Sequence, residues 1–322
     1  MDDYAFGQRL SPAQARELEA LLAKAPEDLA LRRQLVGYYS RLQTESGLAR
    51  SARQRHLLWL YEHHPETFSP QEQGLDPGLD DAVFDQARAI WLRQVKTNPK
   101  SAAIMAAAAC FAPLPDGQTA EALYQRAQTL EPKNPAWPKA LADLYAGQAG
   151  AAGSGTASQA AKKALASLEL AQANTTNAQL RFYNLQSLTR MAFDLGDLAK
   201  ARTYADDLLR QAEEVDTRWG TGDAVYRGHL VLGRIALRES NLAEAKTHLL
   251  AAAATGGSPV LGSFGPNMSL AKELLDKGEK ETVLEFLQRC ADFWTGGKEK
   301  LDNWIRQVQD GDTPDFGANL FY

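Results

Sequence analysis

The chain has 322 residues, of which 44% are hydrophobic and 23% are charged, so it is long and apolar enough to fold around a substantial core. A formal net charge of -5 provides no basic field of the kind that attracts nucleic acid or anionic lipid. The acidic N-terminus is followed by no long apolar run, so we expect no secretory signal, no membrane or nucleic-acid partner, and a cytoplasmic location.

The first predicted element is a helical hairpin near the N-terminus. Leu35 and Tyr39 lie four residues apart on one helix. Ala52, His56 and Trp59, spaced by four and then three residues, share one face of the next helix. Pro65 ends this pair, because proline cannot continue a helix. The segment 69–78 has no periodicity and several helix breakers, which predicts a loop.

An internal repeat follows this loop. Three residues recur 33 positions later at identical internal spacing: Ala87, Trp91 and Pro99 return as Ala120, Tyr124 and Pro132. With Ala127, the second set falls on one face of a helix that the proline ends. This recurrence predicts tandem helical hairpins, each of which buries its open face against the next.

The stretch 116–137 resembles the second helix of a tetratricopeptide repeat and the junction to the next repeat. Trp137, Leu141, Ala142 and Tyr145 supply the residues that this family carries on its first helix, with the tryptophan one position early. The resemblance implies an all-α fold, a right-handed α-solenoid of tandem antiparallel helix hairpins with a capping helix. We expect N-terminal hairpins over 1–146.

The segment 147–158 consists almost entirely of glycine, alanine, serine and threonine. This composition predicts a loop or linker, either a hinge between two subarrays or a surface loop inserted in one array. Weaker copies of the hairpin pattern occupy 159–295; the aromatic positions there are often aliphatic.

The region 296–322 is expected to close the array. Leu301, Trp304, Ile305 and Val308 form one apolar stripe, which predicts a capping helix. The aromatic tail 315–322 either folds back on this helix or serves as a recognition peptide, and we favour folding back, since exposed aromatics reduce solubility. The segments 228–238, 263–275 and 314–322 also resemble the C-terminal half of an uncharacterised bacterial family of tetratricopeptide-like proteins, which implies no activity.

The sequence carries no recognisable motif for catalysis or cofactor binding. The glycines of 150–156 have phosphate-loop spacing, but Thr156 stands where the lysine is required. The five histidines contain no pair four residues apart, and Cys110 and Cys290 form no Cys-x-x-Cys motif and are expected to pack in the core. We therefore predict no catalytic residue, no metal and no cofactor.

The predicted binding face is a groove lined by the first helices of successive hairpins. Aligning the hairpins places several charged residues there: Arg190, Asp194, Arg227, Arg234, Arg238 and Lys272. Arg33 and Arg41 hold comparable positions near the N-terminus. Such arginines favour an acidic peptide or a terminal carboxylate, because guanidinium groups form paired hydrogen bonds with carboxylates. The alternative is that they are solvated and paired with acids such as Glu239 and Glu244.

The leading functional prediction is a non-enzymatic scaffold or adaptor that binds a protein or peptide partner, with the oligomeric state left open. The alternative is an enzyme or small-ligand sensor whose site is formed by the loop 69–78, the turn 262–267 and Trp219. In that turn the backbone amides before the next helix would bind an anion, with Pro266 in its first turn. A third possibility is self-assembly through an uncapped N-terminal end.

Overall fold

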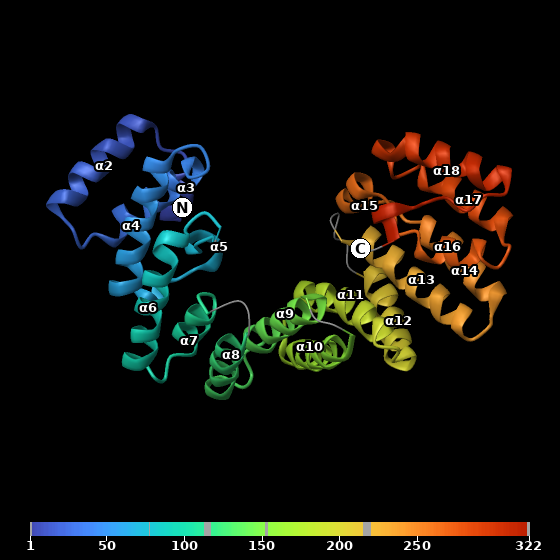
Figure 1. Ribbon diagram of the computed structural model, residues 1–322, viewed down its shortest axis with the longest axis horizontal. Helices are drawn as coiled ribbons and strands as arrows, with labels where there is room; N and C mark the ends of the chain where they lie inside the picture. Colours follow the sequence, from blue (N-terminus) through green and yellow to red (C-terminus); the bar gives the residue numbers. More distant parts are fainter. Residues whose placement is uncertain (1, 77, 113–116, 152–153, 215–219, 321–322) are drawn as a thin grey trace. The chain divides into compact units, whose positions relative to one another are not determined.

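The computed structural model describes residues 2–76, 78–112, 117–151, 154–214 and 220–320. It divides into two compact units, residues 1–148 and 149–322. Every regular element in the described ranges is an α- or 3-10 helix, which confirms the all-α prediction (Figure 1). None of the described helices has the length and apolar character needed to cross a membrane.

The first unit is built from short helices that pack mainly against their neighbours in the chain. The helices are α1 (Asp3–Gly7), α2 (Pro12–Lys24), α3 (Leu29–Leu42), α4 (Gly47–His63), α5 (Pro70–Gln73), α6 (Asp81–Thr97), α7 (Ala102–Ala109), α8 (Gln118–Leu130) and α9 (Ala136–Ala151). Side chains cap their starts: Ser11, Asp28, Ser46 and Ser101 each accept a hydrogen bond from a backbone amide in the first turn. As predicted, α4 ends directly before Pro65.

An aromatic cluster forms the core of this unit. Trp91 on α6 is fully buried, and its ring centroid lies 5.2 Å from that of Tyr61, 5.0 Å from Phe68 and 5.9 Å from Phe111. Ala87, the small residue of the first repeat copy, is also fully buried. The repeated small and aromatic positions therefore serve close packing between neighbouring helices.

The second unit follows the same plan with longer helices. They are α10 (Ser154–Asn174), α11 (Ala178–Asp194), α12 (Leu198–Glu214), α13 (Thr221–Arg238), α14 (Leu242–Ala253), α15 (Pro259–Phe264), α16 (Ser269–Leu275), α17 (Lys280–Cys290) and α18 (Lys298–Asp310). In this unit α11 packs against both α12 and α13, and α13 packs against α14. Figure 1 shows this succession from α11 to α14.

The C-terminal helix and tail pack together at the end of this unit. Leu301, Trp304 and Val308 of α18 are buried, and α18 packs on α17. The tail then returns along the unit: the ring of Phe316 lies 5.0 Å from that of Trp304, edge to face. The Asn319 side-chain amide donates to the Phe264 and Pro266 carbonyls at 3.1 and 3.0 Å. The described part of the tail thus folds back, as we favoured.

The described residues of 147–158 do not form the predicted loop. Helix α9 extends to Ala151 and α10 begins at Ser154, so helix occupies the described residues of this segment. The physical reason is the high helix propensity of alanine, which offsets the cost of the scattered glycines. The boundary between the two units, at 148/149, nevertheless falls inside this segment.

The segment 69–78 is more ordered than the predicted loop, because it contains α5 and is held by buried polar groups. The guanidinium of Arg53 donates to the Gly74 carbonyl at 2.8 Å, and the Tyr61 hydroxyl donates to the Gln73 carbonyl. The buried Asp80 carboxylate accepts from the Asp76 amide at 2.9 Å and from Gln54 at 2.7 Å. Asp80 therefore ties this segment to α4.

The two cysteines differ in their surroundings. Cys290 is fully buried in the core of the second unit, as predicted. The prediction of core packing is wrong for Cys110, which is exposed at the end of α7. It is the C-cap residue of α7, and its Sγ lies 3.5 Å from the Ala106 carbonyl oxygen and 3.8 Å from the Tyr124 hydroxyl.

A close crossing of α1 and α3 makes Gly37 a sensitive position. A Cβ atom at Gly37 would lie 2.1 Å from the Tyr4 backbone oxygen, so Gly37→Ala must separate the two helices. We expect a loss of about 1–3 kcal/mol in the free energy of unfolding, measured by urea titration. The matched control is Gly147→Ala in α9, where a Cβ meets nothing within 4 Å and alanine should stabilise by up to about 1 kcal/mol. Equal effects of both changes would contradict the close crossing.

Candidate functional site

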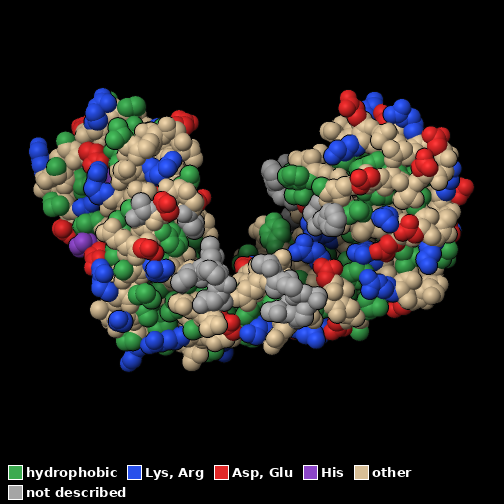
Figure 2. All heavy atoms as spheres, viewed as in Figure 1, with side chains coloured by type: hydrophobic (Ala, Val, Ile, Leu, Met, Phe, Trp, Pro, Cys, Tyr) green, Lys and Arg blue, Asp and Glu red, His purple; other side chains and the backbone are tan. Residues whose placement is uncertain are grey.

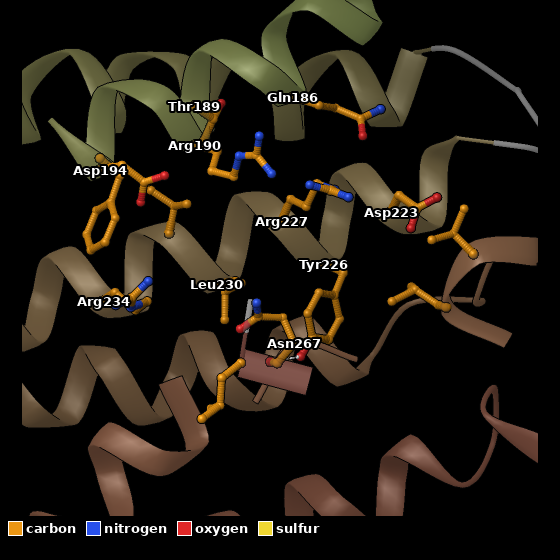
Figure 3. Close-up of a pocket in the computed structure, with 15 residues that line it drawn as sticks. Gln186, Thr189, Arg190, Asp194, Asp223, Tyr226, Arg227, Leu230, Arg234 and Asn267 are labelled. Carbon is orange, nitrogen blue, oxygen red and sulfur yellow. Dashed lines mark hydrogen bonds between the residues drawn. The ribbon is translucent and has the colours of Figure 1, made fainter. Parts of the chain in front are cut away.

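A pocket of about 260 Å³ lies in the second unit between α11, α13, α15 and the C-terminal tail. Arg190 and Asp194 reach it from α11, and Arg227 and Arg234 reach it from α13 (Figure 3). Four of the six residues predicted for the groove thus line one cavity. The helical repeat explains this: residues four and seven apart share a face, and α11 packs directly on α13.

The three arginines of the pocket are held to different degrees. Arg234 is fixed: its guanidinium donates twice to Glu273 Oε1, at 2.9 and 2.6 Å, and lies 4.6 Å from the ring centre of Phe193. Arg227 is half-buried. Arg190 is exposed and makes no hydrogen bond or salt bridge with any described residue. In Figure 3 the guanidinium groups of Arg190 and Arg227 point into the same space.

Two carboxylates accompany these cations. Burial raises the pKa of Asp223, in the first turn of α13, and a hydrogen bond from Ser258 and the charge of Arg227 act against this rise. Asp194 lies at the exposed rim, where partial desolvation raises its pKa against the opposing charge of Arg190. Both carboxylates therefore lie close to the pocket arginines, whose charges oppose the rise in pKa.

Much of the remaining wall is apolar. Tyr226 is buried, and its hydroxyl donates to the Asn267 carbonyl at 2.7 Å. Leu230 and Leu261 line the cavity from α13 and α15, and Leu320 lines it from the tail that Asn319 fastens. The pocket therefore combines a cationic side with an apolar side.

Two of the helices that form the pocket carry exposed apolar side chains. Tyr183 lies on α11 seven positions before Arg190, and hence on the same face, and its side chain is 39% exposed. On α15, Val260 lines the pocket and Phe264, 68% exposed, follows it by one turn. Acidic and basic side chains are interspersed over the face of the second unit seen in Figure 2. The pocket arginines are thus a local feature, in contrast to a field of one sign.

The other predicted groove residues lie elsewhere. The Arg238 guanidinium lies over the Phe193 ring, 4.8 Å from its centre, and Arg238 does not line the pocket. The Lys272 Nζ lies 3.1 Å from the Asp276 carboxylate, at the C-terminal end of the same helix. In the first unit Arg33 pairs with Asp2 and Glu72, and Arg41 donates to the Gln8 and Leu10 carbonyls. Arg33 and Lys272 are thus paired with acids, whereas Arg41 binds backbone carbonyls and Arg238 contacts an aromatic ring.

The predicted turn 262–267 is partly wrong. Helix α15 continues to Phe264, and α16 begins only at Ser269, so Pro266 is not in the first turn of a helix. Gly265, with φ of 83°, turns the chain between the two helices, a conformation that favours glycine. Within 262–267, Asn267 lines the pocket. The other two parts of the predicted enzyme or sensor site are not at this pocket: the loop 69–78 belongs to the first unit, and Trp219 lies outside the described residues.

Sequence reasoning missed a pair of histidines, His229 on α13 and His248 on α14. Their Nδ1 atoms are 3.0 Å apart and the rings are 5.2 Å apart. Burial, followed by the neighbouring imidazole, lowers the pKa of His229 to about 4, and burial also lowers the pKa of His248. The two histidines are 19 positions apart in the sequence and lie on different helices, so no pattern of helical spacing connects them.

We expect this pair to make the stability of the second unit depend on pH. The pKa of His229 is about 4 when folded and 6.5 when unfolded, so the unfolded chain binds more protons between these values. Stability is complete above pH 6.5 and falls as the pH decreases; allowing for solvent screening, the loss by pH 5 is about 1–2 kcal/mol. Urea titrations of wild type and His229→Gln should show a shallower pH slope in the variant. Parallel slopes would contradict the assignment.

No protein-family model matches this chain, and no curated protein shows significant similarity to it. The likeness to tetratricopeptide repeats and to the uncharacterised bacterial family therefore rests on the residues quoted above. The pocket and its charges are the remaining guide to function.

Proposed function

We propose that this chain is a non-enzymatic scaffold or adaptor of the tetratricopeptide-like kind, and that its second unit binds an acidic segment of a protein partner. The segment would occupy the pocket between α11, α13 and α15. The observation that carries the proposal is the position of Arg190, an exposed guanidinium with no hydrogen bond to any described residue, beside the half-buried Arg227. Two guanidinium groups facing one space suit a carboxylate.

The dimensions favour a short peptide over a large cofactor. A cavity of about 260 Å³ is below the range of roughly 300–1,000 Å³ usual for drug-sized ligands. The face of α11 from Tyr183 to Asp194 extends for about 16 Å. That length matches about five residues of extended chain. A peptide with a carboxylate at Arg190 would then place an apolar side chain against Leu230 and Leu261.

The exposed apolar side chains support a macromolecular partner. Tyr183 on α11 and Phe264 on α15 are exposed on two of the helices that form the pocket. Interfaces characteristically place aromatic and arginine side chains at their centre. A small molecule confined to the pocket would leave these side chains uncovered.

The proposal includes a finer description of the fold and its setting. We infer that the hairpins stack as a right-handed, tetratricopeptide-like solenoid in a bacterial, cytoplasmic protein. The contacts of α11 with both the next helix and the one after it support stacking, as does the 33-residue recurrence in the sequence. The two cysteines, both free thiols, support a reducing compartment.

The test is fluorescence anisotropy with labelled five-residue peptides and the full chain. One series carries two glutamates and one leucine, a second replaces the glutamates by glutamines, and a third replaces the leucine by serine. We expect the first series to bind at least about tenfold more tightly than either control, with affinity that falls as salt is added. Equal binding of the acidic and neutral series would refute the proposal. Binding of free amino acids or dicarboxylates without peptide binding would favour the small-ligand sensor.

A further inference from the structure

The segment 315–320 supplies one wall of the pocket and is well fixed to the rest of the second unit. Phe316 is 2% exposed, and its ring packs edge to face on Trp304. The short 3-10 helix η3 (Gly317–Leu320) follows and begins at a glycine whose φ of 52° turns the chain. This turn brings Leu320 to the pocket, where it also packs against the core of the second unit.

Asn319 fastens this wall to the chain between α15 and α16. The residue is 3% exposed, and its side-chain amide donates to the Phe264 and Pro266 carbonyls at 3.1 and 3.0 Å. Its own carbonyl accepts from the Met268 amide at 2.7 Å. These partners lie on both sides of Asn267, which lines the pocket. Asn319 therefore positions two parts of the wall, Asn267 and the residue that follows Asn319 in the chain.

The side of the pocket next to this segment suits an apolar side chain. The Tyr226 hydroxyl is already used, because it donates to the Asn267 carbonyl at 2.7 Å. Leu230 lines the same side and is 8% exposed. Figure 3 shows Leu230, Tyr226 and Asn267 together, below the guanidinium groups of Arg190 and Arg227. A carboxylate at the arginines thus leaves an apolar subsite beside it.

The size of the cavity limits what this subsite can hold. The whole pocket measures about 260 Å³, and a carboxylate and an apolar side chain of one peptide must share it. A cavity that holds a single benzene ring measures about 150 Å³. The larger indole of tryptophan would leave too little room for the carboxylate, whereas the branched side chain of leucine or isoleucine fits. Leu320 contributes to this limit, since its side chain occupies the wall that faces the subsite.

We infer that Leu320 makes the pocket selective for an aliphatic residue, leucine or isoleucine, in the acidic segment of the partner, and that Asn319 is the positioning residue. This refinement rests on the proposed function and describes the partner more closely. Replacing leucine by alanine at position 320 would exchange an isobutyl group for a methyl group. The enlarged subsite should then accept an aromatic ring.

The experiment compares two five-residue peptides on the full chain by fluorescence anisotropy. Both carry two glutamates, and one has leucine where the other has tryptophan. We expect wild type to bind the leucine peptide about tenfold more tightly, and Leu320→Ala to lose or reverse this preference. The control is Leu170→Ala on α10, a leucine that is 38% exposed and lies outside the pocket, which should keep the wild-type ratio. Because each ratio is measured on one protein, partial unfolding of a variant cancels.

Asn319→Ala tests the positioning role, because it removes both side-chain hydrogen bonds and frees the wall. The leucine peptide should then lose most of its advantage of about tenfold over the peptide with serine in place of leucine. The preference for glutamate over glutamine should remain, since the arginines stand on α11 and α13. A loss of both preferences would show that Asn319 only maintains the fold, and would overturn its positioning role.

The outcomes separate this inference from the proposed function. An unchanged ratio of leucine to tryptophan affinity in Leu320→Ala, with the preference for glutamate intact, would overturn the selectivity and leave the proposed function standing. A wild-type chain that binds the tryptophan peptide as tightly as the leucine peptide would do the same. Equal binding of the glutamate and glutamine peptides by wild type would refute the proposed function, and the aliphatic selectivity with it.

Discussion

Reversing the charge of Arg190 is expected to weaken the binding of an acidic peptide by about ten- to a hundredfold. A hydrogen bond to a charged group contributes about 1.5–3 kcal/mol, and Arg190→Glu also sets like charges against each other. Because Arg190 is exposed and makes no hydrogen bond with the described residues, the free energy of unfolding should change by less than about 0.5 kcal/mol. Fluorescence anisotropy with the glutamate peptide, beside a urea titration, measures both quantities.

The chain offers a matched control for this change. Arg289 on α17 is also exposed, and it has an acid, Glu285, four positions away, as Arg190 has Asp194. Arg289→Glu therefore creates the same kind of repulsion on a helix surface outside the pocket. Full peptide affinity in this control and reduced affinity in Arg190→Glu would assign the effect to the pocket. A similar loss in both would assign it to net charge.

The part of the site that the sequence predicts is the part that helical periodicity controls. Arg190 and Asp194 are four residues apart, and Arg227 and Arg234 are seven apart, so each pair shares a face on its helix. Aligning the hairpin patterns in the sequence is sufficient to predict that these two helix faces line the same groove. The prediction did not extend to Lys272, because the chain between α14 and α16 contains the additional short helix α15, which displaces the register.

Features that depend on contacts between helices were not accessible from the sequence. Asp223, Tyr226 and Leu320 line the same pocket, but nothing in their local pattern marks them. The contact between His229 and His248 depends on how α14 rotates about its axis against α13. The helical state of 147–151 and 154–158 was missed for a different reason: glycine and serine suggested a break, and the alanines between them outweigh it.

Truncation of Trp91 to alanine is expected to cause the largest loss of stability, about 3–5 kcal/mol. The side chain is fully buried, and three other aromatic rings surround it in the core between α4, α6 and α7. These rings cannot collapse into the space that an indole leaves, so a cavity remains. Amide hydrogen exchange should show loss of protection in α4, α6 and α7, with protection retained in α13 and α17 of the second unit.

Two further variants separate the causes of this loss. The indole N–H of Trp91 has no hydrogen-bond partner among the described residues, and an unsatisfied buried donor costs about 1–3 kcal/mol. Trp91→Phe removes that donor while keeping an aromatic ring, so it should lower the free energy of unfolding clearly less than Trp91→Ala.

Trp304→Ala is the counterpart in the second unit, where the indole donates to the Asp315 carbonyl at 3.3 Å. It should expose α17, α18 and the tail to exchange and leave α4 and α6 protected. If both alanine variants lost protection over the whole chain, the two units would unfold as one, and the repeat copies would stabilise each other beyond their nearest neighbours.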